Sequence, residues 1–427
     1  MSTSGRFGLP IAHRFRSFPA YPLADVPQIK RELTARGVDV IDLGAGDADL
    51  APPPAAVRAL AEASREPAMS RYPFQLGLPS FRETVARWME RRFGTALDPY
   101  SEILPLIGSK EGIAHLALCY VSAGDVTIIP DPGYQPYIGG TLLAGGEPYL
   151  VPLRAENDFL IPLRSLPPDI VARTRILYLN YPNNPTAAVA PRSWLEEVVA
   201  FCHTHRIVLV YDNAYSEIAF DGYLPPSILE IEGARDVAVE FHSCSKTYNM
   251  TGWRIGWAAG GREAIAALAR VKAFVDTGPF LCVQAAAQAA LESHAAWVPG
   301  NIEAFRVRRD ALVGALREHG FEADVPKATM YVWFPVPKGY DSHGFARRAL
   351  LEAGEPVRQR DVDGFRRCHA HEPCSSLLVT GLRTWLWPHN STSTTSPGSR
   401  RPTPSGVPVA IRSPGSSVMM RLTNEMI

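Results

Sequence analysis

The chain has 427 residues, of which 46% are hydrophobic and 20% are charged, and its formal net charge is zero. This length is too great for one small core and predicts two domains, or one large domain with an appendage. Because there is no excess of either charge, the composition gives no reason to expect nucleic acid or an anionic membrane as the partner.

The N-terminal stretch MSTSGRFGLPIAHRFRSFPAYPL has no apolar core of the kind found in secretion signals. No run of 18 apolar residues occurs, so no membrane-spanning helix is expected. The six cysteines are scattered without the close pairing of a metal site, which predicts free thiols in a reducing compartment and no metal. We therefore expect a soluble cytoplasmic protein.

Short apolar runs alternate with helical patterns through the first 250 residues. Helices are expected at 54–66, 80–94 and 193–205, and strands at 38–44, 103–108, 125–134, 175–185, 207–215 and 237–246. This alternation predicts an α/β fold with a mostly parallel sheet flanked by helices. Ligands bind such sheets at the carboxyl ends of their strands.

From about residue 262 the pattern becomes mainly helical, followed by a strand at 328–337 and a helix at 342–354. We interpret residues 48–285 as a large ligand-binding domain and 286–354 as a smaller, incomplete α+β domain. The N-terminal segment 1–47 is expected to join the small domain. Residues 355–427 contain no lysine and are rich in Arg, Pro, Ser and Thr, which predicts a largely disordered tail.

The stretch HSCSKTYNMTGWRIGWAAG surrounds one lysine, Lys246, with small hydroxyl residues and places glycines and tryptophans after it. A lysine amine can bond to an aldehyde cofactor and then relay protons. If that cofactor is pyridoxal phosphate, its phosphate requires hydroxyls, backbone N–H groups and a cation. Its ring requires a carboxylate for the nitrogen, donors for the phenolic oxygen and an aromatic face.

The sequence offers a candidate for each requirement. Asp212 ends an apolar run and suits the ring nitrogen, with Tyr215 three residues later. Asn184 lies in the sharp turn NYPNNPT, and Tyr134 in DPGYQPY is a candidate stacking ring. The candidates for the phosphate are Ser109, Lys110, Ser243, Ser245 and Arg254.

Each candidate taken singly has an ordinary structural interpretation. Lys246 could be a solvated lysine, and Asp212 a turn residue. Asn184 before a proline could simply form a turn. One cofactor would nevertheless explain all the candidates in chain order, and this favours the cofactor-binding hypothesis.

Five separated motifs together resemble fold-type I, class I/II aminotransferases, which depend on pyridoxal phosphate. These motifs are YPFQLGLPSFR, GSKEGI, YPNNPT, YDNAY and SCSKTYNMTGWRIGWAAG, and the resemblance runs from about residue 15 to 354. VDVIDLGAGDADL together with GSKEGI is most similar to the LL-diaminopimelate aminotransferase branch. Ala48, Tyr181 and Ala187 depart from the pattern usual in that branch.

The resemblance implies a role for each residue. Lys246 would be the covalent lysine and general base, Asp212 the partner of the ring nitrogen, and Asn184 with Tyr215 the partners of the phenolic oxygen. Tyr134 would stack on the ring. Tyr72 would reach the phosphate of the neighbouring subunit in a homodimer, and Gly46 and Tyr21 would lie near the substrate carboxylate.

One expected part is absent from the sequence. The family binds the substrate carboxylate with an arginine on a late strand reading roughly Tyr-x-Arg-Ile-Ser, and a guanidinium suits a carboxylate better than other side chains do. Arg383, Arg412 and Arg421 are available, but none has this context. The abrupt change of composition suggests a reading-frame shift near codon 355, with a genuine divergent tail as the alternative.

The sequence therefore predicts a ping-pong aminotransferase that acts on an amino acid and a 2-oxo acid, such as LL-diaminopimelate and 2-oxoglutarate. A lyase or decarboxylase using the same cofactor is a second hypothesis, because the residues around the lysine do not fix the reaction. A third is a cofactor-binding protein that is impaired by its aberrant C-terminus.

Overall fold

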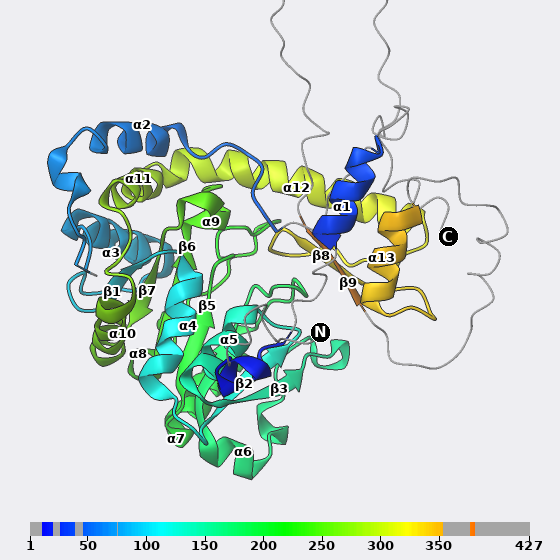
Figure 1. Cartoon of the computed structure of the whole chain (residues 1–427), viewed down its shortest axis with the longest axis horizontal. Coiled ribbons are helices and arrows are strands. Elements are labelled where there is room, and N and C mark those ends of the chain that lie inside the picture. The colour runs from blue at the N-terminus through cyan, green and yellow to red at the C-terminus, as the bar shows by residue number, and fades with distance from the viewer. Residues whose placement is uncertain (1–10, 20–25, 39–45, 75, 353–375, 381–427) are drawn as a thin grey trace, which may run out of the picture. The chain divides into compact units, whose positions relative to one another are not determined.

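The computed structural model describes residues 11–19, 26–38, 46–74, 76–352 and 376–380 (Figure 1). The chain divides into two compact units. Unit 1 comprises Met1–Pro19, Leu50–Ala304 and Pro326–Thr329, and unit 2 comprises Ala20–Asp49, Phe305–Val325 and Met330–Ile427. The domain limits given above stay a prediction.

A seven-stranded sheet forms the centre of unit 1, in the order β1-β7-β6-β5-β4-β2-β3. Strand β7 pairs antiparallel with β1 and β6, and the other pairs are parallel. The predicted mostly parallel sheet is confirmed. The strands are β1 (Ile103–Leu106), β2 (Val126–Asp131), β3 (Glu147–Pro152), β4 (Thr174–Leu179), β5 (Val208–Asp212), β6 (Ala238–Ser243) and β7 (Gly256–Gly260).

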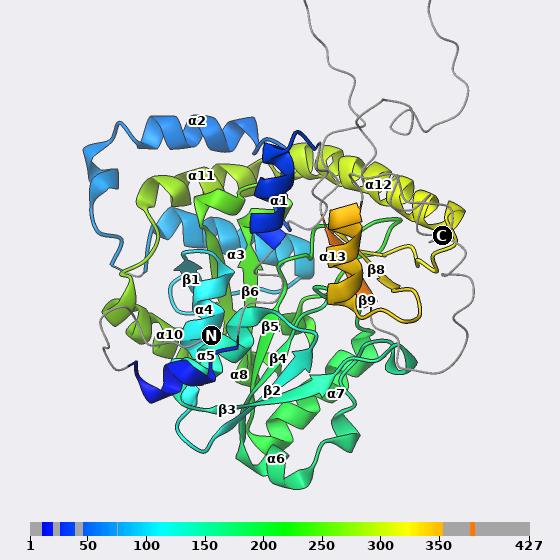
Figure 2. The same ribbon diagram turned by 45° about the vertical axis from the view of Figure 1, so that its right-hand side comes forward.

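Helices cover both faces of this sheet (Figure 2). The three helices predicted before residue 246 are present, and Gly94 ends α3 in the left-handed conformation that favours glycine. The helices of unit 1 are α2 (Pro54–Ala63), α3 (Pro79–Phe93), α4 (Ser109–Tyr120), α5 (Gln135–Ala144), α6 (Pro168–Arg173), α7 (Arg192–His205), α8 (Ala234–Val237), α9 (Cys244–Thr247), α10 (Arg262–Val275) and α11 (Leu281–Glu292). Helix α12 (His294–Glu318) begins in unit 1 and ends in unit 2.

The two faces of the sheet form two separate apolar cores, because successive side chains of a strand point to opposite faces. Leu209 and Tyr211 of β5 belong to the core that includes residues of α3, α7 and α11. Val210 belongs to the other core, which includes residues of α4, α5 and α10. Asp212 is next in this alternation and therefore faces α4 and α5.

Unit 2 has a small core of its own, which includes Leu316, Phe321, Phe334 and Phe345. The Arg308 guanidinium is paired with the Asp49 carboxylate, with Nη1 and Oδ1 2.8 Å apart. Strands β8 (Tyr331–Pro335) and β9 (Ser376–Thr380) pair antiparallel. The helices contained in unit 2 are α1 (Val26–Ala35) and α13 (Ser342–Glu352).

Several elements differ from the sequence-based expectation. Strands β3, β7 and β9 were not predicted, because β3 and β7 carry proline or glycine and β9 is a short apolar run within polar surroundings. The strand expected at 175–185 ends at Leu179, since the prolines that follow favour a turn. The strand expected at 38–44 and most of the tail lie outside the described residues. Among the described helices, none is both long and apolar enough to cross a membrane.

Candidate active site

Apart from Tyr72, the predicted site residues of unit 1 collect at the carboxyl edge of the sheet. Asp212 is the last residue of β5 and Ser243 the last residue of β6. Ser109 begins α4 shortly after β1, and Tyr134 caps α5 shortly after β2. Chain segments far apart in sequence thus reach one edge, where parallel sheets bind ligands.

Lys246 lies on α9, a single turn of helix directly after β6. The Ser243 hydroxyl caps this helix by accepting a hydrogen bond from the Ser245 N–H, 3.1 Å away. Both serines are buried and Lys246 is half-buried. The capped turn fixes the backbone that presents the lysine to the edge of the sheet.

The turn formed by residues 107–110, here called the Gly108 turn, connects β1 to α4. Gly108 has φ +74 and ψ 154, a conformation that side chains other than glycine rarely adopt. Arg254 lies against it, with its Nη2 donating to the Ile107 carbonyl at 3.5 Å and its Nη1 to the Thr251 carbonyl at 2.8 Å. A guanidinium beside the N-terminus of a helix is an arrangement suited to a phosphate.

A cluster of charged side chains supports the Gly108 turn from within the protein. Glu111, in the first turn of α4, accepts the Ile107 N–H at 3.0 Å and pairs with the ammonium of Lys272. The Lys272 side chain is completely buried and also donates to Asp276 at 3.0 Å. His115 Nδ1 lies 2.9 Å from the Glu111 carboxylate.

The pKa of Glu111 reflects this cluster. Burial would raise it, but the hydrogen bond from His115 and the charge of Lys272 hold it below its ordinary value. Glu111 therefore stays ionised and keeps hold of both the turn and the lysine.

Asp212 is the one buried carboxylate among the predicted site residues, and its side chain is 4% exposed. Its Oδ2 accepts the hydroxyl of Tyr137 at 2.9 Å. Its Oδ1 is buried with no hydrogen-bond partner among the described residues. Burial raises the pKa of Asp212 to about 6, against the opposing effects of Tyr137, the Ala214 N–H, His242 and Lys246.

The turn after β4 is tied to the end of β5 by an asparagine. The Asn180 side chain donates to the Asp212 main-chain oxygen at 2.6 Å and accepts the Asn184 N–H at 2.6 Å. Asn184 is half-buried and Tyr215 is buried. Asn180 thus holds the Asn184 turn and Asp212 in one hydrogen-bonded unit.

Tyr134 lies beside the Gly108 turn. The Lys110 ammonium lies 5.7 Å from the centre of its ring, within the range of a cation–π contact. The ring also meets Tyr137 edge-on, with 5.9 Å between the centroids. The first of these contacts brings together two predicted cofactor contacts, Tyr134 and Lys110.

Three predicted site residues do not join this group in unit 1. Tyr72 is 74% exposed and contacts Phe74. Gly46 belongs to unit 2, where it lies next to Tyr331. Tyr21 lies outside the described residues, as do Arg383, Arg412 and Arg421.

Four residues that support the site from behind were not predicted from the sequence, namely Tyr137, Asn180, Glu111 and Lys272. A signal for Tyr137 was present, because it follows Tyr134 by three residues in DPGYQPY and shares its helical face. The others have polar partners on remote segments, which no local pattern reveals.

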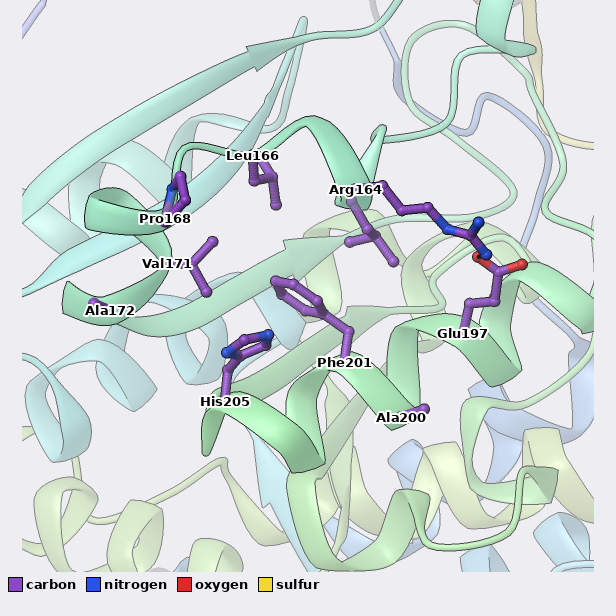
Figure 3. Close-up of a pocket in the computed structure, with 10 residues that line it drawn as sticks. Arg164, Leu166, Pro168, Val171, Ala172, Glu197, Ala200, Phe201 and His205 are labelled. Atoms are coloured by element: carbon purple, nitrogen blue, oxygen red, sulfur yellow. Dashed lines mark ion pairs between the residues drawn. The ribbon is translucent and has the colours of Figure 1, made fainter.

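A separate apolar groove of about 550 Å³ lies between α7 and the segment containing α6 (Figure 3). Leu166, Val171 and Phe201 line it, and Arg164 pairs with Glu197 at 3.6 Å at its margin. None of the predicted site residues lines this groove, so it plays no part in the site described above.

Comparison with known proteins identifies the family. Residues 38–362 match the family described as aminotransferase class I and II. The LL-diaminopimelate aminotransferase of Desulforudis audaxviator is 50% identical over 343 residues, which are 80% of this chain and 88% of that protein. The enzyme of the same name from Moorella thermoacetica is 47% identical over the same shares of the two chains.

Solved structures agree with this assignment. A probable N-succinyldiaminopimelate aminotransferase from Thermus thermophilus has a TM-score of 0.73 and 39% identity, covering 77% of this chain and 88% of that one. Substrate-bound BacF from Bacillus subtilis has a TM-score of 0.76 and 33% identity, covering 81% and 88%. The fold-type I architecture, the mostly parallel sheet and the sequence likeness together show that this chain belongs to the class I and II aminotransferases, enzymes that transfer amino groups and whose family implies dependence on pyridoxal phosphate.

Proposed function

We propose that this aminotransferase moves an amino group from LL-diaminopimelate to 2-oxoglutarate in a ping-pong cycle, with Lys246 as the catalytic residue. The observation that carries the substrate assignment is the 50% identity over 343 residues to a protein named LL-diaminopimelate aminotransferase. The chain also covers 88% of that protein's length, so the likeness extends over nearly the whole enzyme.

The residues at the sheet edge fit pyridoxal phosphate. The buried Oδ1 of Asp212 has no partner among the described residues, and a protonated ring nitrogen would supply one. A Cβ at Gly108 would collide with the guanidinium of Arg254, so glycine allows this cation to lie against the turn, where it could pair with a phosphate. Ser109, Lys110, Ser243, Ser245 and Arg254 would hold the phosphate, Asn184 and Tyr215 the phenolic oxygen, and Tyr134 the ring face.

When bound, pyridoxal phosphate supplies an electron-withdrawing ring that stabilises negative charge at the substrate α-carbon and carries the amino group between the two substrates. Lys246 would supply the amine that attaches the cofactor to the protein. Its Nζ would also serve as the general base that accepts the α-proton of the substrate and as the acid that returns it. Asp212, kept ionised, holds the proton on the ring nitrogen.

The enzyme is proposed to act as a homodimer in which Tyr72 reaches the phosphate site of the partner subunit. Its 74% exposure in the single chain supports this assignment, as does the exposure of Phe74 beside it. Large exposed aromatic side chains in close contact are typical of protein interfaces. Gly46 and Tyr21 remain the proposed contacts of the substrate carboxylate.

Absorption spectroscopy of the purified chain with added pyridoxal phosphate tests the proposed function. A visible band that moves to the near ultraviolet on adding LL-diaminopimelate, and returns on adding 2-oxoglutarate, is the expected result. L-Lysine is the matched control, because it lacks only the distal carboxylate. A response to N-succinyldiaminopimelate instead would overturn the substrate assignment, and the absence of any band in folded protein would overturn the role of Lys246.

The homodimer is tested by mixing subunits. Tyr72→Ala and Lys246→Ala chains are each expected to be nearly inactive. After unfolding and refolding together, half of the dimers are mixed and carry one site with both native residues. Activity should therefore recover to about a quarter of the wild-type value. No recovery, in a sample shown to contain mixed dimers, would exclude a shared site.

A further inference from the structure

The two carboxylate oxygens of Asp212 have different surroundings. Oδ2 accepts the Tyr137 hydroxyl at 2.9 Å, whereas Oδ1 has no partner among the described residues. The backbone of Asp212 is held separately, because its carbonyl accepts the Asn180 side chain at 2.6 Å. With the main chain fixed and one oxygen bonded, the direction of the other oxygen is set.

Tyr137 is itself held firmly. Its side chain is completely buried, and its ring stacks on Tyr178 with 4.9 Å between the centroids and 19° between the planes. Tyr134 meets the ring edge-on, and the main-chain oxygen of Tyr137 accepts the Thr141 hydroxyl at 2.7 Å. The Tyr137 hydroxyl therefore cannot turn away from Asp212 without disturbing a packed core.

The chemistry of the pair fixes which group donates. Burial, with the nearby charge of Asp212, raises the pKa of Tyr137 well above its ordinary value, so the hydroxyl keeps its proton. A hydrogen bond to an ionised carboxylate favours the ionised form. Lys246 on α9 and His242 on β6 are the other titratable side chains that act on Asp212, and both favour its charge.

We infer that Tyr137 is a positioning residue of this enzyme, which holds the Asp212 carboxylate ionised and directs its Oδ1 to the ring nitrogen of the cofactor. The inference rests on the proposed pairing of Asp212 with that nitrogen. Tyr137 acts through Asp212 and has no contact with the substrate in this scheme. Its removal should weaken cofactor binding and shift the pH dependence of binding.

The test compares Tyr137→Phe with Tyr178→Phe. Both changes delete one hydroxyl from the same stacked pair of buried rings, but it is the Tyr137 hydroxyl that donates to Asp212. The dissociation constant of pyridoxal phosphate is measured by fluorescence titration of the cofactor-free protein between pH 5 and 9. Tyr137→Phe should bind about tenfold more weakly at neutral pH, the effect of losing a hydrogen bond to a charged group.

The pH dependence separates positioning from mere packing. Without the Tyr137 hydrogen bond the pKa of Asp212 rises, so tight binding should begin at a higher pH in Tyr137→Phe than in the wild type. Tyr178→Phe should follow the wild-type curve. Equal affinities and equal pH curves for the two variants would overturn the inference, whatever their thermal stabilities.

A double-mutant cycle with Asp212→Asn covers the case in which Tyr137→Phe folds poorly. In the Asp212→Asn background, Tyr137→Phe leaves no buried charge uncompensated and should cost little further cofactor affinity. An undiminished loss in that background would show that Tyr137 does not act through Asp212. If Asp212→Asn bound the cofactor as tightly as the wild type, the proposed role of Asp212 would fail instead, so the two failures are distinguishable.

Discussion

Gly108 and Arg254 are packed so closely that a Cβ at Gly108 would lie 3.0 Å from the guanidinium carbon of Arg254 and still closer to its Nη2. Real Cβ atoms essentially never come closer than this distance to a neighbour. The guanidinium therefore keeps its place beside the first turn of α4 only while residue 108 is glycine.

Gly108→Ala should weaken cofactor binding by about tenfold or more, because it displaces a charged donor from the proposed phosphate site. Gly94→Ala is the matched control. Gly94 also has positive φ, at +67, but open space around its Cβ position. Both variants should lose stability on thermal unfolding, and only Gly108→Ala should lose affinity in a cofactor titration. Equal cofactor affinities of the two variants would show that cofactor binding does not depend on the position of Arg254 beside residue 108.

Lys246→Arg should reduce kcat by at least about a thousandfold, since it removes both the covalent amine and the general base. Arginine keeps the positive charge near Asp212, so the protein should still fold and still bind the cofactor non-covalently. Steady-state kinetics with a circular dichroism check make the measurement. Retention of a tenth of the activity would exclude Lys246 as the catalytic residue.

Asp212→Asn should stabilise the cofactor-free protein at pH 7 while weakening cofactor binding. The folded-state pKa of Asp212 is raised from 3.8 to about 6, so its ionisation destabilises the fold as pH rises through this window. The shift lowers the free energy of unfolding of the wild type by about 3 kcal/mol above pH 6, and by almost nothing below pH 4. Thermal unfolding of both proteins across this range measures the difference. A constant difference at every pH would mean that ionisation of Asp212 is not its cause.

Lys272→Met should destabilise the protein by about 3–5 kcal/mol, because it leaves the carboxylates of Glu111 and Asp276 without the buried cation that pairs with them. Arg173→Met breaks an exposed pair with Glu147, 2.9 Å apart, and should cost about 1 kcal/mol or less. Urea unfolding compares the two. Similar losses in both variants would mean that the buried cluster contributes no more than a surface ion pair.

The change of composition after residue 354 makes a prediction at the level of DNA. One of the two other reading frames beyond codon 355 should encode a strand of the type Tyr-x-Arg-Ile-Ser, which would supply the arginine for the substrate carboxylate. Sequencing and translating this region of the gene is the measurement. If neither of the other two reading frames encodes such a strand, the result would favour a genuine divergent tail.

The fold class and the enzyme family were predictable from the sequence because both depend on local patterns. The strands leading to Asp212 and Ser243 are apolar runs with a polar end, and the lysine motif is continuous. Strand β7 was missed because it consists largely of glycine and alanine, which are depleted in strands.

The support of the site was less predictable, because its hydrogen bonds join residues that are distant in sequence. Tyr137 and Asp212 are 75 positions apart, and Lys272 and Glu111 are 161 apart. No periodicity or short motif links such positions. Only the order of the strands brings α5 to β5 and α10 to α4, and that order was not part of the prediction.

The buried ammonium of Lys272 has a consequence for how the Gly108 turn keeps its shape. Glu111, His115 and Asp276 lie close enough together to hold a metal ion, but the Lys272 nitrogen already supplies the positive charge that their oxygens require. The counter-ion of this cluster is thus covalently part of the polypeptide. We therefore expect the geometry at the start of α4 to be encoded in the sequence and to be insensitive to chelators in the surrounding medium.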